Sequence, residues 1–214
     1  MTRHQYHASL SEKSLRGLQG MIGMEIIQFQ AFCGTSYSCN IRGDAILDIH
    51  FNADVHMTFK NGDREYFEWT IINQSFGDTW VGFDMYGLDI ELKQHKASIK
   101  DWLESIKGSP ESNMLRFSTT ETLKNIDIYG VNEKFNRLDE GRSVAHVDAN
   151  LDSLIVLNTT DNNKLVITGN GRNSSRDILI TRYPKRETYE FEEWVESREN
   201  QWNERIFNFK RRIE

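Results

Sequence analysis

The stretch LDIHFNADVHMTFK, residues 47–60, decides the fold class because apolar and polar residues alternate along it without a break. Period two is the repeat of a β-strand, in which successive side chains point to opposite faces of the sheet. The apolar positions are Leu47, Ile49, Phe51, Ala53, Val55, Met57 and Phe59. The sequence therefore predicts a half-buried strand, or a pair of strands, in an antiparallel sheet.

This stretch is too long for one straight strand in a compact protein. Fourteen extended residues span roughly 46 Å, because each adds about 3.3 Å. A compact chain of this length has a radius of gyration of about 17 Å. We therefore expect a bend, a bulge or a tight turn near residues 52–54.

A hairpin signal, Asn61-Gly62, follows the alternation directly. A two-residue loop would set apolar residues of one strand opposite polar residues of the next. A three-residue loop, residues 61–63, sets Met57 opposite Phe67 and keeps the apolar faces together. We therefore expect the three-residue loop, with Gly62 at positive φ.

Two further stretches predict helices. Residues 96–107 carry apolar residues on one helical face and end at Gly108-Ser109-Pro110. Residues 188–212 have acids in the first turns and bases in the last, which complements the helix dipole, and Thr188 is a plausible N-cap. We expect a long C-terminal amphipathic helix here.

The predicted fold class is α+β, a mostly antiparallel sheet with one mid-chain helix and a long C-terminal helix. Residues 1–14 are polar and are expected to fray, and the secondary structure of residues 132–150 is ambiguous. The chain is expected to be a single domain, 1–214. An alternative is two similar β-rich halves, 24–130 and 131–214, since both contain strands separated by polar turns.

The formal net charge of −6 argues against a general nucleic-acid binder, which needs a basic surface. Residues 44–91 are more acidic than the whole chain, with ten acids against Lys60 and Arg64, a net charge of −8. Such a field steers basic partners. The alternative is an acidic face that only keeps the protein soluble. The ten acids are Asp44, Asp48, Asp54, Asp63, Glu65, Glu68, Asp78, Asp84, Asp89 and Glu91.

The sequence predicts a cytoplasmic protein without a cofactor. Residues 1–18 lack the apolar segment of a secretory signal, and no apolar run approaches the length of a membrane span. Cys33 and Cys39 are too few for a disulfide framework or a zinc site. We expect both to be reduced thiols in a cytosolic protein.

The polar positions of the alternating stretch gather Asp48, His50, Asp54 and His56 on one face. Imidazole and carboxylate groups bind metals, but residues two apart on a strand lie about 7 Å from each other, which is wide for one ion. A turn at residues 52–54 would bring the two histidines closer. We expect a binding surface here and no metal, the simplest alternative being a solvated strand face.

A second group, Asp84 with Glu91 and Lys93, matches in outline the acids and lysine of PD-(D/E)xK nucleases. In those enzymes the carboxylates hold Mg²⁺ and the lysine orients water or stabilises charge. Asp78 could take the place of Asp84. Because Glu-x-Lys is common at strand ends, this catalytic interpretation is the alternative to a binding role.

The segment from Asp48 to Tyr129 resembles the immunity proteins of bacterial polymorphic toxin systems. The resemblance rests on an acidic meander, a strand closing in Glu-Leu, a short Trp-Leu helix and a strand that ends in an acid. The matching residues are Trp80–Met85, Leu88–Leu92, Trp102-Leu103, Leu115–Glu121 and Ile126–Tyr129. This resemblance implies a non-enzymatic inhibitor that plugs a toxin's active site.

The sequence thus predicts a non-enzymatic protein-binding inhibitor that takes a basic protein partner through residues 44–91. Its mechanism would be occlusion of the partner's site with electrostatic steering. A homodimer through residues 188–213 is a further expectation, and no membrane or nucleic-acid partner is expected. The alternatives are the metal-dependent nuclease and a structural or phage-type interaction protein without catalysis.

Overall fold

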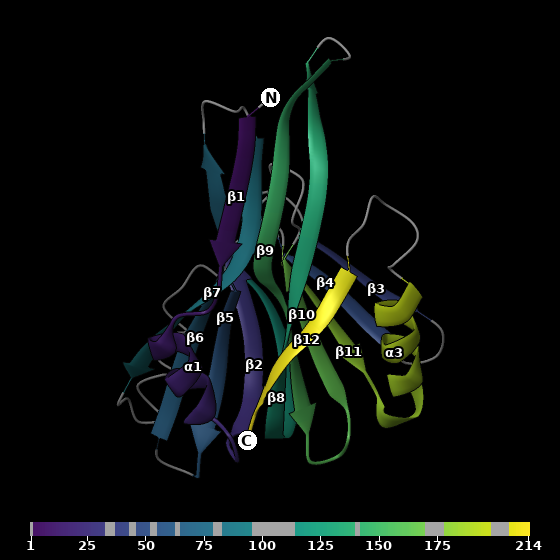
Figure 1. Cartoon of the computed structure of the whole chain (residues 1–214). Coiled ribbons are helices and arrows are strands. Elements are labelled where there is room, and N and C mark those ends of the chain that lie inside the picture. The colour runs from purple at the N-terminus through teal and green to yellow at the C-terminus, as the bar shows by residue number, and fades with distance from the viewer. Residues whose placement is uncertain are drawn as a thin grey trace.

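The computed structural model describes residues 2–32, 37–42, 46–51, 55–62, 65–78, 83–95, 114–139, 142–169, 178–197 and 206–214. Within them lie twelve strands, two short α-helices and one 3₁₀ turn (Figure 1). In chain order they are β1 (Thr2–Ala8), α1 (Glu12–Gln19), β2 (Glu25–Phe32), β3 (Tyr37–Arg42), β4 (Ile46–Phe51), β5 (Val55–Asn61), β6 (Glu65–Asp78), β7 (Phe83–His95), β8 (Met114–Asp139), β9 (Arg142–Thr159), β10 (Lys164–Gly169), β11 (Ile178–Tyr183), η3 (Lys185–Glu187), α3 (Thr188–Ser197) and β12 (Ile206–Ile213).

The strands form one sheet whose main path runs β3-β4-β11-β10-β9-β8-β2-β5-β6-β7, with β12 on β8 and β1 on β9. The β1–β9 pair is parallel, and the other pairs are antiparallel. This confirms the predicted antiparallel sheet. Strand β8 belongs to two half-sheets, because residues 114–122 pair with β2 and residues 123–139 pair with β9. We call β3, β4, β11, β10 and β9 the first half-sheet, and β2, β5, β6 and β7 the second.

The alternating stretch is divided between the two half-sheets. Strand β4 pairs with β3 and β11, whereas β5 pairs with β2 and β6. The expected bend at residues 52–54 lies outside the described residues. Ile49 of β4 nevertheless shares one buried cluster with Val55, Met57 and Phe59 of β5. The period of two therefore marks two strands that cover the same core from different half-sheets.

The β5–β6 hairpin has a three-residue loop, as expected, but the loop comprises residues 62–64. Gly62 has φ of 61°, which confirms the predicted positive φ. Met57 lies opposite Trp69, where we expected Phe67. Because side chains alternate with period two, a shift of two residues still brings the apolar faces together.

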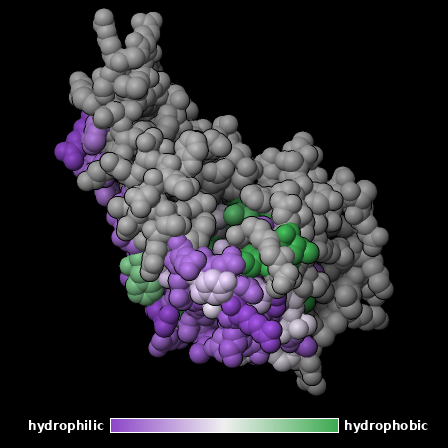
Figure 2. Space-filling model, turned by 90° about the vertical axis from the view of Figure 1, so that its right-hand side faces the viewer, coloured by the Kyte–Doolittle hydropathy of each residue, from purple (hydrophilic) through white to green (hydrophobic). Residues whose placement is uncertain are grey.

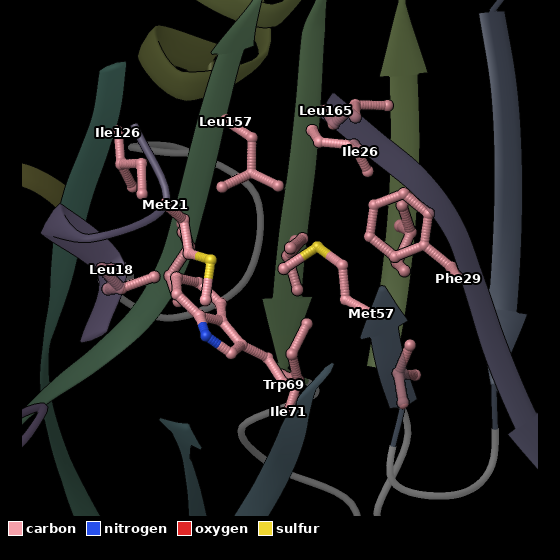
Figure 3. Close-up of a cluster of buried hydrophobic side chains, with 14 of the residues drawn as sticks. Leu18, Met21, Ile26, Phe29, Met57, Trp69, Ile71, Ile126, Leu157 and Leu165 are labelled. Atoms are coloured by element: carbon pink, nitrogen blue, oxygen red, sulfur yellow. The ribbon is translucent and has the colours of Figure 1, made fainter. Parts of the chain in front are cut away.

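The main core lies between the half-sheets (Figure 3). Phe29 and Trp69 enter it from the second half-sheet, and Leu157 and Leu165 from the first, each with no exposed surface. Burying such a side chain contributes roughly 1.5–3 kcal/mol before entropy is counted. This shared core holds the two half-sheets together.

Helix α1 covers part of the same core. Its N-cap is Ser11, whose hydroxyl oxygen accepts the Ser14 N–H at 3.0 Å. Leu18 of α1 and Met21, just beyond it, are buried in the main cluster (Figure 3). The capped helix therefore supplies apolar side chains that the strands do not.

A second apolar cluster lies under α3 on the other face of the first half-sheet. The Phe191 ring meets Tyr129 and Tyr183 with centroids 6.1 Å and 5.8 Å away. The buried members of this second cluster are Ile46, Leu154, Val156, Val166, Tyr183 and Phe191. Seen from this side, the described surface is mainly hydrophilic, and hydrophobic residues show in a small area (Figure 2).

The predicted helix over residues 188–212 is wrong. Its first part forms α3, which ends at Ser197, and residues 198–205 lie outside the described part of the chain. The last part is strand β12, which pairs antiparallel with β8. The long C-terminal amphipathic helix of the expected fold class is therefore replaced by a short helix and a strand.

A β-bulge in β12 separates two apolar residues that a helix would place on one face. Phe209 and Ile213 are four positions apart, the spacing of one helical face. Between Phe209 and Arg211 the register with β8 shifts, so Phe209 lies opposite Tyr129 and Ile213 opposite Ile126. Tyr129 and Ile126 point to opposite faces of the sheet, so Phe209 stays exposed while Ile213 is buried. Burial of Ile213 in the main core then favours the strand over the helix.

Residues 2–8, 132–139 and 142–150 form strands, contrary to the expected fraying of residues 1–14. Beyond Asn132, β8 pairs with β9, and β1 pairs with the other edge of β9. Beyond Asn132 the β8–β9 hairpin projects from the body of the molecule (Figure 1), and β1 pairs with β9 below its tip. We call these segments the arm: residues 2–8, 133–139 and 142–151.

Two other expectations concern the middle of the chain. The predicted helix at residues 96–107 lies outside the described residues. Strand β8 runs without interruption through residues 130 and 131, where the boundary between the two expected halves would fall. None of the helices in the described part of the chain has the length and apolarity needed to cross a membrane.

Candidate protein-binding site

The structure separates the residues that the sequence placed on one polar face. Asp48 and His50 lie on β4 in the first half-sheet, and His56 lies on β5 in the second. Asp54 lies outside the described residues. The four residues therefore do not share one strand face.

Asp48 and His56 are each engaged within their own half-sheet. The Thr181 hydroxyl donates a hydrogen bond to Asp48 Oδ1 at 2.7 Å. His56 Nδ1 lies 3.3 Å from the Thr70 hydroxyl oxygen, so the two form a cross-strand hydrogen bond. Both side chains are half-buried. They contribute to local strand pairing from two separate places on the sheet.

The candidate nuclease residues lie on a single strand. Asp84, Glu91 and Lys93 all belong to β7, opposite Gly77, Thr70 and Glu68 of β6. Seven positions separate Asp84 from Glu91, which is roughly 23 Å along an extended strand. A two-carboxylate metal site needs ligands from neighbouring strands at one place. This register does not bring Asp84 and Glu91 together.

Asp78, the alternative first acid, ends β6 opposite Phe83. Its partner position is therefore even farther along β7 from Glu91. Among the residues that the structure describes, no group of three or more His, Cys, Asp and Glu side chains is placed to hold a metal ion.

The acidic residues of the stretch 44–91 gather mainly on β6 and β7. These neighbouring strands carry six acids and one base, Lys93, a net charge of −5. The acids are Glu65, Glu68, Asp78, Asp84, Asp89 and Glu91. We call β6 and β7 the acidic ribbon. Because β7 is the last strand of the main sheet path, this charge lies at one end of the sheet.

The acidic ribbon differs from the strands beside it. Strand β5, the next strand along the path, carries only Lys60 as a charged residue apart from His56. The only base of the ribbon, Lys93, lies directly opposite Glu68, so the other acids have no base at a directly opposite position within the two strands. A concentrated field of one sign attracts charged partners of the other sign.

Three buried carboxylates, which sequence reasoning missed, hold the body together. Asp127, Asp152 and Glu121 have side chains no more than 7% exposed. Their cationic partners are Arg212, Lys210 and Arg182 respectively. The only local signal is an acid inside an apolar run, as in Ile126-Asp127-Ile128.

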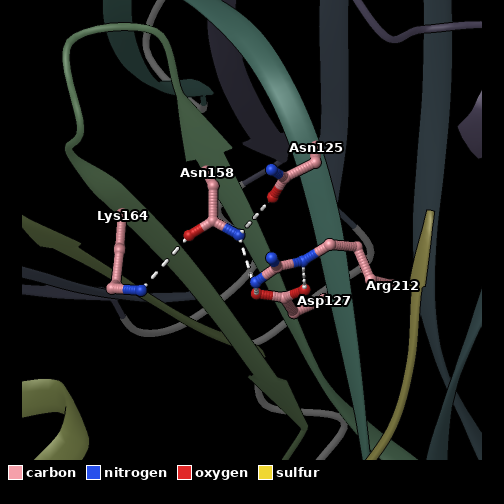
Figure 4. Close-up of polar contacts among 5 residues, drawn as sticks. All are labelled: Asn125, Asp127, Asn158, Lys164 and Arg212. Atoms are coloured by element: carbon pink, nitrogen blue, oxygen red, sulfur yellow. Dashed lines mark hydrogen bonds and ion pairs between the residues drawn. The ribbon is translucent and has the colours of Figure 1, made fainter. Parts of the chain in front are cut away.

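Asp127 is the centre of a network (Figure 4). Arg212 donates from Nε and an Nη atom to the two carboxylate oxygens at 2.6 and 2.9 Å. The Asn158 amide donates to Asp127 at 2.9 Å and to Asn125 at 2.8 Å. The hydrogen bond and negative charge of Asp127 raise the pKa of Arg212. Burial, followed by the charge of Asp127, raises the pKa of the neighbouring Tyr129 hydroxyl.

Asp152 joins both ends of the chain to β9. Its Oδ2 accepts the Leu10 N–H at 2.8 Å, and its Oδ1 lies 2.5 Å from Lys210 Nζ. Lys210 is the residue at the bulge of β12, and its side chain crosses over Gly130 of β8. This carboxylate is a structural anchor, since one charged group, Lys210, and one backbone donor satisfy it.

Gly130→Ala is expected to destabilise the protein by about 1–2 kcal/mol. A Cβ at this position would lie 2.0 Å from Lys210 Cε, so the flexible lysine side chain would have to shift away from its present position over β8. Urea denaturation followed by circular dichroism measures the change. In a Lys210→Ala background the same substitution should cost almost nothing, and an equal cost in both backgrounds would contradict the steric explanation.

The fold and the site define the chain as a mainly antiparallel β protein with an acidic ribbon and buried ion pairs. Comparison of the chain with protein-family models, curated proteins and solved structures finds no match. Its function must therefore be inferred from its own residues.

Proposed function

We propose that the protein is a non-catalytic binding module that takes a basic protein partner on the acidic ribbon. The observation that carries this proposal is the net charge of −5 on two neighbouring strands at one end of the sheet. The partner would be a basic toxin or another effector enzyme in the cytoplasm, as the resemblance to immunity proteins implies. Binding would occlude the partner's working site.

The acidic ribbon would act mainly on the rate of association. Complementary charge steers encounter and raises association rates well above those of neutral surfaces, with a strong dependence on salt. By the register of β6 and β7, Glu68, Asp89 and Glu91 share the face of the ribbon opposite to that of Trp69, so a basic partner would meet them together. The separation of Asp84 from Glu91 supports a binding role for these acids over the nuclease alternative.

Reversing two charges on the acidic ribbon tests the proposal. Asp89→Lys with Glu91→Lys should weaken binding of a fluorescent arginine-rich peptide by about tenfold or more at low salt. Fluorescence anisotropy at several salt concentrations measures this, and the wild-type affinity should fall steeply as salt increases. The double variant should bind less tightly because the two substitutions remove negative charge from β7.

The matched control reverses two exposed acids of α3, Glu192→Lys with Glu193→Lys. Both double variants change the net charge by the same amount. The α3 variant should bind the peptide almost as wild type does. Equal weakening by the two variants would mean that overall charge, and not the acidic ribbon, attracts the peptide, and this would overturn the proposal.

A further inference from the structure

A row of polar side chains crosses the neighbouring strands β8, β9 and β10. Asn158 of β9 lies directly opposite Lys164 of β10 and directly opposite Asn125 of β8. Directly opposite residues point to the same face of a sheet, so their side chains can touch. Figure 4 shows them turned toward one another, with Asp127 of β8 beside the Asn158 amide. An amine, an amide and a carboxylate therefore meet at one place.

Three hydrogen bonds fix which side of the Asn158 amide faces the lysine. The Nδ2 group donates to Asn125 Oδ1 at 2.8 Å and to Asp127 Oδ2 at 2.9 Å, so both of its hydrogens are used. The Oδ1 atom is then left for Lys164, whose Nζ donates to it at 3.3 Å. The carbonyl carbon, Cγ, lies one bond beyond that oxygen. The lysine nitrogen is thus held at the carbonyl side of the amide, and the carboxylate is held at the amide nitrogen.

The surroundings limit the motion of these groups and their contact with water. The Asp127 side chain is only 4% exposed, and Arg212 binds both of its oxygens. The buried Phe191 ring lies with its centroid 5.5 Å from Lys164 Nζ. Groups that are held close to the reacting geometry react far faster than the same groups free in solution. The arrangement therefore favours a reaction between Lys164 and Asn158 over attack by water.

We propose that Lys164 and Asn158 become joined by an amide cross-link in the folded chain, with the release of ammonia. The neutral amine of Lys164 attacks Asn158 Cγ, and a bond forms between Nζ and Cγ. The bond between Cγ and Nδ2 then breaks, and Nδ2 leaves as ammonia. The atoms balance without an oxidant or a co-reactant, because an amine and a primary amide give a secondary amide and ammonia.

The Asp127 carboxylate carries the proton that this exchange requires. Attack leaves an extra proton on Nζ, whereas Nδ2 must gain one before it can leave. After attack both nitrogens are bonded to the same carbon, so a carboxylate 2.9 Å from Nδ2 can take the proton from one and give it to the other. Proton transfer by a positioned side chain contributes roughly 10²–10⁴-fold to a rate. Asp127 is therefore the catalytic residue of the cross-linking step.

The cross-link joins β9 to β10 beside the turn that connects them, residues 159–163. This turn is already closed, because the Asn163 N–H donates to the Thr159 hydroxyl at 3.2 Å and the Thr159 N–H to the Asn163 carbonyl at 3.1 Å. The two strands are thus held in register at the reacting residues before a covalent bond forms. The cross-link does not involve the acidic ribbon, so it is independent of the proposed binding function.

Mass spectrometry of the full chain tests the cross-link. After incubation at alkaline pH, where more of the lysine is neutral, the wild-type mass should be lower by one ammonia than the mass calculated from the sequence. A cross-linked Lys164 is no longer a site for trypsin, so digestion should give one peptide of residues 143–172 that lacks one ammonia. Its fragment ions should show that Asn158 and Lys164 are joined.

Two variants separate the reaction from the fold. Lys164→Arg keeps the positive charge but removes the primary amine, so the cross-linked peptide should disappear. Asp127→Asn keeps the shape of the carboxylate and should slow the reaction by about a hundredfold or more. Lys124→Arg is the matched control, because it makes the same substitution at an exposed lysine of β8 and should cross-link as wild type does. Circular dichroism establishes that every variant is folded.

Loss of ammonia by another route is distinguishable from the cross-link. The sequence Asn170-Gly171 in the same peptide can lose ammonia by forming a succinimide, and this loss would persist undiminished in Lys164→Arg. Such persistence would overturn the proposal, and so would a wild-type chain that keeps its full mass. Hydrolysis of Asn158 to aspartate, seen as an increase in mass, would show that water and not the lysine reaches Cγ, which would equally refute the cross-link.

Discussion

Lys210→Met is expected to destabilise the fold by about 3–5 kcal/mol, the range found when one partner of a buried ion pair is removed. The Asp152 side chain is only 1% exposed, and Lys210 Nζ lies 2.5 Å from its Oδ1. Methionine keeps most of the aliphatic length of the side chain. Among the residues that the structure describes, only the Leu10 N–H then remains as a partner of the carboxylate. The urea midpoint, with an unchanged slope, measures the loss.

An exposed ion pair provides the matched control. Arg3 and Asp148 approach to 3.7 Å, and the arginine is 66% exposed. Arg3→Met should therefore change stability by no more than about 1 kcal/mol. Adding Asp152→Asn to Lys210→Met should recover part of the loss, because the buried charge is then gone. A loss below about 1 kcal/mol for Lys210→Met would show that Asp152 has another cationic partner.

The antiparallel sheet could be predicted because its evidence is local. In residues 47–60, burial of one side of each strand imposes a period of two, and Ile49, Val55, Met57 and Phe59 do lie in one core. The register of the following hairpin was two residues off because the loop 62–64 begins one residue later than the turn signal suggested. The assignment of β4 and β5 to different half-sheets has no signal of this kind.

The C-terminal error has a physical cause. Glutamates near Thr188 favour a helix start, and α3 does begin there. The spacing of Phe209 and Ile213 then seemed to continue the helix, whereas the bulge at Lys210 places the two residues on opposite faces of a strand. Pairing with β8 and burial of Ile213 depend on residues far away in the sequence, so tertiary structure decided between the two.

The arm was missed because it has no strong local pattern. Residues 132–144 are mostly polar, and the alternation of apolar and polar residues over 145–151 is only seven residues long. Strand β1 pairs in parallel with residues 145–151, and Thr2 lies 143 positions before its partner Ala145 in the sequence. Such pairings cannot be deduced from a single sequence.

The acidic ribbon could be predicted in part, because its evidence is local in the sequence. The excess of acids over residues 44–91 is visible in the sequence, and the structure gathers six of them on β6 and β7. The separation of Asp48 from His56 is not visible, because it depends on the pairing of β4 and β5. The buried ion pairs join residues 58 and 85 positions apart, as in Lys210 with Asp152 and Arg212 with Asp127.

Trp69→Ala is expected to destabilise the protein by about 3–5 kcal/mol, since it removes the largest fully buried side chain of the described core. The indole packs against Phe59 with ring centroids 5.0 Å apart and lies beside Met21 (Figure 3). Because Phe59 and Trp69 point from the second half-sheet into the main core, the cavity would open between the half-sheets. Urea denaturation measures the loss, and a cost below about 2 kcal/mol would contradict this position for the indole.

Trp69→Phe separates volume from hydrogen bonding. The indole Nε1 is buried and has no hydrogen-bond partner within the described structure, and a buried donor left unsatisfied costs about 1–3 kcal/mol. Phenylalanine removes that donor and keeps an aromatic ring against Phe59. The loss of volume and the removal of the donor then act in opposite directions, so Trp69→Phe should cost at most about 1–2 kcal/mol. A loss close to that of alanine would contradict an unsatisfied Nε1 donor at this position.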